Sequence, residues 1–150
     1  MIQVIGLGNE LRGDDGIGPR ILAELKQSRY SYKVNLINAA ADAFIVLEYL
    51  NGSDPVIIID CAQMGRNAGE VVVFNADAAH LERMNMLISL HGFGLAEIYR
   101  MAQALGPVAP CKIIGVEPKS IEFNSGLSVE VEQSIPKIIN LVIEEIKKNV

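Results

Sequence analysis

The chain has 150 residues, of which half are hydrophobic, 5% are aromatic and none is tryptophan. This length predicts one domain, residues 1–150, with a sizeable buried core, and the aliphatic composition favours strands between helices over a β-sandwich or an aromatic stacking platform. The formal net charge of -5 argues against nucleic acid or an anionic membrane as the main partner, because both require a basic face.

Strands and helices alternate in the first part of the chain. Residues 2–5 are short and β-branched, which is typical of a buried strand, and apolar side chains over residues 17–25 recur at helical spacing. Residues 33–37 and Ala43–Leu50 repeat the strand and the helix. Residues 55–60 form a continuous aliphatic run, as in a parallel strand that is covered on both faces.

The second half contains a different kind of strand. Residues 70–74 are connected to the preceding strand by a segment too short for a helical crossover, which indicates an antiparallel edge strand. Residues 75–90 show no regular pattern. Residues 94–105 have an apolar helical face, and Cys111–Val116 form a fifth strand.

The last segment, residues 128–148, is amphipathic and has glutamates at its start and lysines at its end, as the helix dipole favours. Pro136 is expected to kink this helix or to delay its start. Together the elements predict an α/β fold, a three-layer sandwich with helices on both faces of a mostly parallel five-stranded sheet that has one antiparallel edge strand. Such sheets bind ligands beyond the carboxyl ends of their strands.

Cysteine usage and the N-terminal sequence bear on the compartment. The two cysteines, Cys61 and Cys111, have no paired spacing, which argues against a disulfide framework and a zinc motif. The N-terminus has no signal-peptide pattern, and no apolar run reaches the length of a membrane span. We therefore expect a cytoplasmic protein with no membrane partner.

The stretch from Gly6 to Gly18, GLGNELRGDDGIG, follows the first strand, where a nucleotide-binding loop commonly lies. Leu11 replaces the third glycine of a dinucleotide fingerprint, and no Lys-Ser or Lys-Thr pair follows to make a P-loop. Asp14 and Asp15 would also repel a pyrophosphate at the start of the helix. The sequence therefore predicts that no nucleotide binds here.

Two carboxylates are candidates for chemistry. Asp14 is interpreted as the cap of the helix that follows. A second acid beside it is costly unless a cation or a proton is shared, which makes Asp15 a functional candidate. Asp60 ends the third strand, and it is expected near Asp15 because the first and third strands of such a sheet are commonly neighbours. A solvated strand end is the alternative interpretation of Asp60.

The histidines and the possible nucleophiles can also be separated into functional candidates and ordinary residues. His91 is followed by glycines that allow a ligand to approach closely, whereas His80 has no such context and is interpreted as an ordinary packed or exposed residue. Two carboxylates and one imidazole suit a divalent ion such as nickel, zinc, iron or manganese. A thiol nucleophile is less favoured because Asp60 would raise the pKa of Cys61, and Ser125 lies in a turn, not in a nucleophile elbow.

Several stretches resemble, in chain order, the motifs of the hydrogenase maturation endopeptidases, which trim the C-terminus of the large subunit of nickel–iron hydrogenases. These stretches are Gly6-Leu7-Gly8-Asn9, Asp14-Asp15-Gly16-Ile17-Gly18, Ile59-Asp60, Met64-Gly65, Ala68-Gly69-Glu70, His91-Gly92-Phe93-Gly94-Leu95, Ile114-Gly115-Val116-Glu117-Pro118 and Gly126-Leu127-Ser128. They extend over nearly the whole chain, which makes the resemblance far more specific than one glycine-rich loop.

The resemblance implies an endopeptidase in which Asp15, Asp60 and His91 are both the catalytic and the metal-contacting residues. The implied metal is nickel carried by the substrate, and zinc or cadmium are other divalent ions that can occupy such a site. The implied partner is the hydrogenase large-subunit precursor, cleaved beyond its last cysteine motif after a basic residue, and the protein is expected to be a monomer. A carboxylate that activates water and a nickel ion that polarises the carbonyl are both chemically available.

One segment departs from the family pattern. The family often has an Asp-Gly-Gly or Asp-Gly-Thr stretch after its second strand, where this chain has Asn38-Ala39-Ala40-Ala41-Asp42. Either Asp42 replaces the family's acid through a shifted loop, or Asn38 serves as a neutral hydrogen-bonding group. Together with Asn9, these are the predicted substrate-binding residues.

Two other classes of protein stay open at this point. The first is a non-catalytic metal-binding or chaperone module that docks on a hydrogenase-like partner, which the departure at Asn38 and the lack of a recognisable nucleophile would suit. The second and poorer alternative is a flavin- or nucleotide-binding fold, which predicts a bound chromophore in the purified protein.

Overall fold

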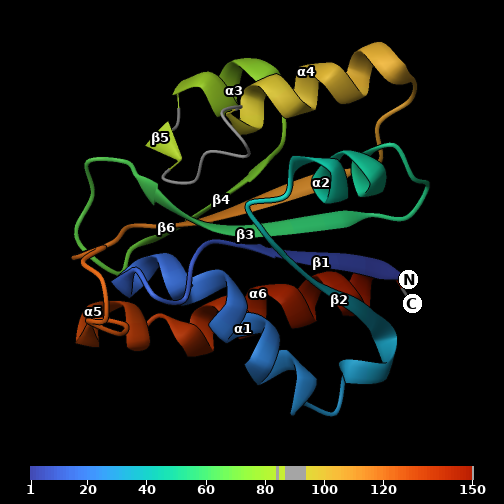
Figure 1. Ribbon diagram of the computed structural model, residues 1–150. Coiled ribbons are helices and arrows are strands. Elements are labelled where there is room, and N and C mark those ends of the chain that lie inside the picture. The colour runs from blue at the N-terminus through green and yellow to red at the C-terminus, as the bar shows by residue number, and fades with distance from the viewer. Residues whose placement is uncertain (84, 87–93, 150) are drawn as a thin grey trace.

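Five strands form the main sheet of the computed structural model, which describes residues 1–83, 85–86 and 94–149 (Figure 1). Their spatial order is β2-β1-β3-β6-β4. Their bounds are Ile2–Leu7 for β1, Val34–Ala40 for β2, Val56–Gln63 for β3, Val71–Asn75 for β4 and Cys111–Val116 for β6. A two-residue strand, β5 (Asn85–Met86), pairs with the last two residues of β3.

The pairing of the strands confirms the predicted sheet. β1 pairs in parallel with both β2 and β3, and β3 pairs in parallel with β6. β4 runs antiparallel to β6 at one edge of the sheet. The segment between β3 and β4 is too short to cross back over the sheet, so the chain returns in the opposite direction.

β3 continues past residue 60, where the sequence predicts its end. β6 pairs with β3 as far as Cys61, and β5 pairs with the two residues that follow. Asp60 therefore lies inside the strand, opposite Gly115, and is fully buried. This corrects both the predicted strand end and the alternative interpretation of Asp60 as a solvated residue.

Helices cover both faces of the sheet, as Figure 1 shows. One layer contains α1 (Ile17–Lys26), α5 (Val129–Glu132) and α6 (Ile135–Lys148), and the other contains α2 (Ala43–Leu50), α3 (Ala78–Arg83) and α4 (Leu95–Leu105). Successive residues of β3 supply two separate cores, because side chains alternate between the faces of a strand. Ile57 and Ile59 pack with α1 and α6, whereas Ile58 packs with α2 and α4.

Two helices show how the sequence pattern relates to structure. The C-terminal helix is divided, as expected from Pro136: α5 ends before it, and α6 begins at Ile135 with the proline in its first turn, where the missing N–H removes no hydrogen bond. α3 lies in a segment for which the sequence predicts no regular pattern. Its one buried residue is Leu81, so no apolar periodicity marks it.

Two glycines allow α1 to lie very close to β1. A Cβ atom on Gly18 would lie 2.3 Å from the carbonyl oxygen of Leu7, and a Cβ atom on Gly6 would lie 2.9 Å from the carbonyl of Gly18. No side chain fits at these distances. The close packing holds the 3-10 turn before α1, η1 (Gly13–Gly16), at the carboxyl edge of the sheet.

The chain ends lie at the other edge of the sheet, close to one another in Figure 1. Met1 and Asn149 line the same cavity, of about 400 Å³, next to the second 3-10 turn, η2 (Ser31–Lys33). In the part of the chain that the structure describes, no helix is both long and apolar enough to cross a membrane.

Candidate functional site

Asp15 lies in η1 at the carboxyl edge of the sheet, with 3% of its surface exposed. The backbone N–H of Asn9 donates to its Oδ2 atom at 3.0 Å. Its Oδ1 atom is buried and has no hydrogen-bond partner among the described residues. Gly8 permits this arrangement, because its φ of +119° favours glycine and a Cβ atom there would lie 2.0 Å from the carbonyl oxygen of Asp15.

Asp60 lies one residue beyond the last pair between β1 and β3, and its exposed fraction is 0%. Its Oδ1 atom accepts a hydrogen bond of 2.7 Å from the backbone N–H of Cys61. Its Oδ2 atom is buried and, within the described segments, finds no donor. Buried carboxylate oxygens normally have partners, so this strand interrupts an apolar core with an acid that is only half satisfied.

The carboxyl groups of Asp15 and Asp60 both have raised pKa values, and the charge of Asp15 contributes to the shift at Asp60. Burial raises the pKa of Asp15, which the Asn9 N–H and the charge of Arg12 lower only in part. Burial raises the pKa of Asp60 well above its ordinary range, and the negative charge of Asp15 raises it further. Two such acids stay together only if they share a proton or face a cation. The effect of the Asp15 charge indicates that the two residues lie near one another, and their catalytic and metal-contacting roles stay predictions.

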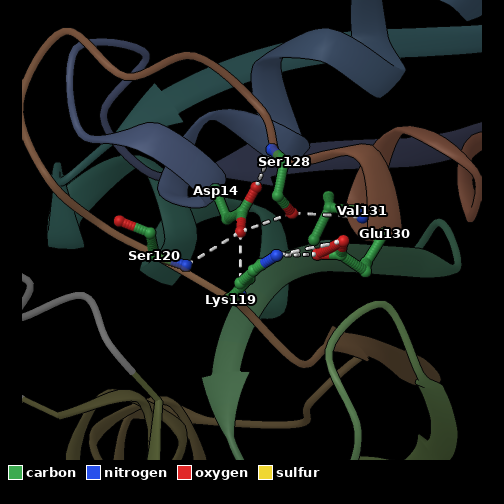
Figure 2. Close-up of polar contacts among 6 residues, drawn as sticks. All are labelled: Asp14, Lys119, Ser120, Ser128, Glu130 and Val131. Atoms are coloured by element: carbon green, nitrogen blue, oxygen red, sulfur yellow. Dashed lines mark hydrogen bonds and ion pairs between the residues drawn. The ribbon is translucent and has the colours of Figure 1, made fainter.

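Asp14 does not cap α1, which corrects the sequence interpretation. Asp14 is itself part of η1, and Gly16 holds the N-cap position of α1 without any side-chain cap. The Asp14 carboxylate instead accepts hydrogen bonds from Lys119, Ser120 and Ser128, in the segment that follows β6 (Figure 2). The cap interpretation fails because Asp14 lies within η1, two residues before the N-cap of α1, and its carboxylate is already occupied by donors of the distant segment.

Residues 119–128 carry no chemical motif that would identify them as neighbours of the site. Their position in the chain is the signal that was available: they follow the fifth strand, and parallel strands bring the segments after them to the same edge. The serine of Gly126-Leu127-Ser128, one of the stretches that resemble family motifs, is both the N-cap of α5 and a partner of Asp14.

His91 lies outside the described residues, so the structure places only Asp15 and Asp60 of the predicted trio. Within residues 1–83, 85–86 and 94–149, no three His, Cys, Asp or Glu side chains are grouped so as to hold a metal ion. His80 is packed, as predicted for an ordinary residue: its ring stacks on that of Phe74, with the ring centroids 3.9 Å apart.

A groove of about 390 Å³ beside Asp15 contains two of the three predicted substrate-binding residues. Asn9 and Asn38 line it, together with Leu11 and Ala40. Asp42 does not line it. The Asp42 carboxylate caps α2 by accepting from the N–H groups of the first turn, so its oxygen is already engaged in holding the helix start.

Neither Cys61 nor Ser125 is in an environment that would activate it as a nucleophile. The Cys61 thiol is buried and donates to the carbonyl oxygen of Asp14 at 3.2 Å, and burial, followed by the charge of Asp60, raises its pKa. A thiol with a raised pKa is a poor nucleophile. Ser125 donates to the carbonyl of Glu122 in a turn, as the sequence predicts.

The described part of the site is therefore a pair of acids with two free oxygens and a groove next to it. Such a pair can bind a divalent cation through oxygen atoms or hold a proton between the carboxyl groups. It would repel an anion, which agrees with the predicted absence of a nucleotide but does not test it.

Comparison with known proteins gives one consistent family. A family model described as hydrogenase maturation protease matches residues 19–145. A protein of Methanocaldococcus jannaschii, inferred to be a hydrogenase maturation protease, is 32% identical over 98% of this chain and 89% of its own length. The hydrogenase 2 maturation protease of Escherichia coli is 29% identical over 99% and 92%, respectively.

Solved structures agree with the sequence relatives. The hydrogenase maturating endopeptidase HybD from E. coli superposes with a TM-score of 0.81 and 27% identity, over 99% of this chain and 93% of that one. The hydrogenase maturation protease HybD from Thermococcus kodakarensis superposes with a TM-score of 0.76 and 25% identity, over 95% and 97%.

Proposed function

The chain belongs to the hydrogenase maturation protease family, and from this premise we propose that it removes a C-terminal peptide from the nickel-loaded large-subunit precursor of a nickel–iron hydrogenase. The observation that carries the proposal is the buried pair of Asp15 and Asp60, each with one oxygen that has no partner in the described chain. A cation supplied by the substrate would give both oxygens a partner.

Asp15 and Asp60 are proposed to contact the nickel of the substrate, with His91 as the third contact. Carboxylate oxygens and an imidazole nitrogen are ligands that nickel accepts, and zinc or cadmium would be held by the same donors. Without the cation, the raised pKa of Asp60 favours its protonated form. The arriving cation would displace that proton, because a coordinating carboxylate must be ionised.

The water that attacks the peptide bond has two routes to activation in this site. A carboxylate of the pair can accept its proton, as in general base catalysis. The nickel of the substrate can instead polarise the scissile carbonyl. In both routes Asp15 and Asp60 place the reacting groups, and the aspartic type of protease mechanism is part of the proposal.

The groove next to Asp15 is proposed to hold the substrate residues that flank the cleaved bond. Asn9 connects the two places, because its N–H donates to Asp15 and its side chain lines the groove. Asn38 lines the groove, whereas Asp42 is engaged as the cap of α2. Of the two residues that could replace the family's acid, Asn38 is therefore the one we propose as a neutral hydrogen-bonding group. A monomer acting in the cytoplasm completes the proposal.

The test is to incubate the protein with nickel-loaded and with nickel-free precursor and to measure the loss of C-terminal mass. We expect only the nickel-loaded precursor to be trimmed. His91→Ala should abolish trimming, and the matched variant His80→Ala should retain it, because His80 packs on Phe74 away from the acid pair. Equal cleavage of both precursors would contradict nickel recognition. Binding of the precursor without cleavage would favour the non-catalytic module instead.

A further inference from the structure

The side chain of Asp14 is fully buried and completely satisfied by a segment more than one hundred positions away in the sequence. Its Oδ2 atom accepts from the N–H groups of Lys119 and Ser120 at 2.8 and 3.1 Å and from the Ser128 hydroxyl at 2.9 Å. Its Oδ1 atom accepts from the Ser128 N–H at 2.7 Å. Figure 2 shows the carboxylate enclosed by these donors.

The contact is a set of hydrogen bonds and not an ion pair. The Lys119 ammonium group, whose backbone N–H is one of the donors, pairs with Glu130 instead (Figure 2). Three of the four donors around Asp14 are backbone N–H groups, which cannot reverse their polarity. A carboxylate is therefore the group that fits, since an amide of the same shape would turn a donor toward another donor.

The backbone of Asp14 continues the connection to the acid pair. Its N–H donates to the carbonyl of Ser120 at 2.8 Å, and its carbonyl accepts from the thiol of Cys61, the neighbour of Asp60. Asp14 thus connects three segments: the loop that carries Asp15, the end of β3 and the segment after β6. The Asp15 carboxylate itself accepts one hydrogen bond within the described chain, from Asn9, so its place depends largely on where the η1 turn is held.

We propose that Asp14 is a positioning residue, which fixes Asp15 beside Asp60 by fastening the η1 turn to residues 119–128. The inference rests on the proposed function for what Asp15 does to the substrate. It does not rest on that function for the position of Asp15, which can be measured in the free protein. The same four contacts also stabilise the fold, so the test distinguishes the positioning of Asp15 from stabilisation alone.

The test compares Asp14→Asn with Asn51→Asp, the reverse isosteric substitution. Asn51 lies at the amino edge of the sheet, by which we mean the side where the parallel strands begin; the carboxyl edge is the side where they end. The Asn51 amide donates to the carbonyls of Ala102 and Pro107, so both variants break a long-range connection between a side chain and the backbone. Amide hydrogen exchange by NMR reports on the Asn9 N–H, the donor to Asp15. We expect Asp14→Asn to accelerate this exchange by about tenfold or more and Asn51→Asp to leave it unchanged at a similar melting temperature.

The outcomes are distinct. Unchanged exchange at Asn9 in Asp14→Asn, equal acceleration in both variants, or an Asn9 N–H that is unprotected in the unmodified protein would each overturn the proposal. If Asp14→Asn does not fold, Ser128→Ala, which removes one of the four donors, should still accelerate the exchange several-fold, and no change would overturn it.

Cleavage gives a second readout. If the unmodified protein trims the precursor, Asp14→Asn should lower kcat roughly tenfold to a hundredfold with KM unchanged. If the unmodified protein does not trim it, the proposed function fails while the exchange at Asn9 still decides the role of Asp14.

Discussion

Buried polar side chains have hydrogen-bond partners at the amino edge of the sheet and lack some of them at the carboxyl edge. At the amino edge, the Gln3 side chain is buried, donates to Asp54 at 3.0 Å and accepts from Asn35 at 2.7 Å. At the carboxyl edge, Asp15 and Asp60 are just as buried, yet each has an oxygen without a partner in the described chain. Buried polar groups without partners destabilise a fold. Among the described residues, both of these half-satisfied aspartates lie at the carboxyl edge, where the proposed cation would give their oxygens a partner.

The same contrast separates two neighbours in the chain. Asp14 has every donor that its carboxylate needs, and Asp15 has one. A pair of adjacent acids in a sequence can therefore consist of one that holds the loop and one that is left available. The resemblance to the family singles out Asp15, and the number of hydrogen-bond donors gives the physical difference between the two acids.

The largest effect is expected from Asp60→Asn, with Asp54→Asn as its counterpart at the amino edge. Asp60→Asn should lower cleavage by roughly a hundredfold to ten-thousandfold, yet raise the melting temperature by a few degrees, because a neutral amide needs neither a cation nor a shared proton. Asp54→Asn should leave cleavage unchanged and alter the free energy of unfolding by less than about 1 kcal/mol. Activity assays and thermal unfolding measure both.

A loss of stability in Asp60→Asn would contradict this contrast, because it would mean that the acid contributes to the fold. A loss of cleavage in Asp54→Asn would also contradict the contrast, because it would mean that the amino edge contributes to activity.

A smaller effect, on stability, is expected from the glycine beneath Asp15. Gly8→Ala combines an unfavourable φ with a clash against the Asp15 carbonyl, and should destabilise the protein by roughly 2–5 kcal/mol. Gly65→Ala is the matched control, since Gly65 also has a positive φ but faces open space, and should cost about 1–2 kcal/mol. Urea unfolding measures the difference, and equal losses would show that the approach of η1 to Gly8 is not a tight contact.

The smallest effect is a pH dependence of stability, measured with a chelator present. Burial and the charge of Asp15 raise the pKa of Asp60 in the folded state, so the folded protein binds the proton more tightly than the unfolded chain does. This stabilisation is complete below the ordinary aspartate pKa of about 4 and is lost as the pH rises through the raised value. The advantage of Asp60→Asn over the unmodified protein should therefore grow above about pH 4.

A divalent cation should reduce that advantage, because it stabilises the ionised pair in the unmodified protein and has one ligand fewer in the variant. A difference in melting temperature that is constant between acid and neutral pH would show that Asp60 is not the group that titrates.

The parallel core and the antiparallel edge strand could be predicted because they depend on local features, whereas of the strand order only the neighbourhood of the first and third strands was expected. The aliphatic run before Asp60 and the short connection to β4 settle the parallel core and the antiparallel edge. The far end of β3 could not be predicted, because a charged residue such as Asp60 after an aliphatic run usually indicates the end of a strand. Only the pairing of Asp60 with Gly115 and of the next residues with β5 reveals it.

The site was predictable to a similar degree. That Asp15 and Asp60 lie near one another was expected because the first and third strands of such a sheet are commonly neighbours, and β1 does pair with β3. The role of Asp14 does not follow from sequence, because three of its four donors are backbone N–H groups, and the motif-like stretch that contains Ser128 does not indicate what that serine contacts. Contacts of the backbone leave no trace in side-chain identity, so a helix cap was the reasonable interpretation.

The position of the first and last described residues has a practical consequence for experiments with the proposed precursor. Met1 and Asn149 line one cavity at the end of the sheet where β1 starts (Figure 1), and Asp15 and Asp60 lie toward the opposite ends of the parallel strands. An affinity handle or a surface tether at either end would therefore leave the approach of a bulky precursor free. The enzyme could be immobilised on a sensor and presented to its partner in one orientation.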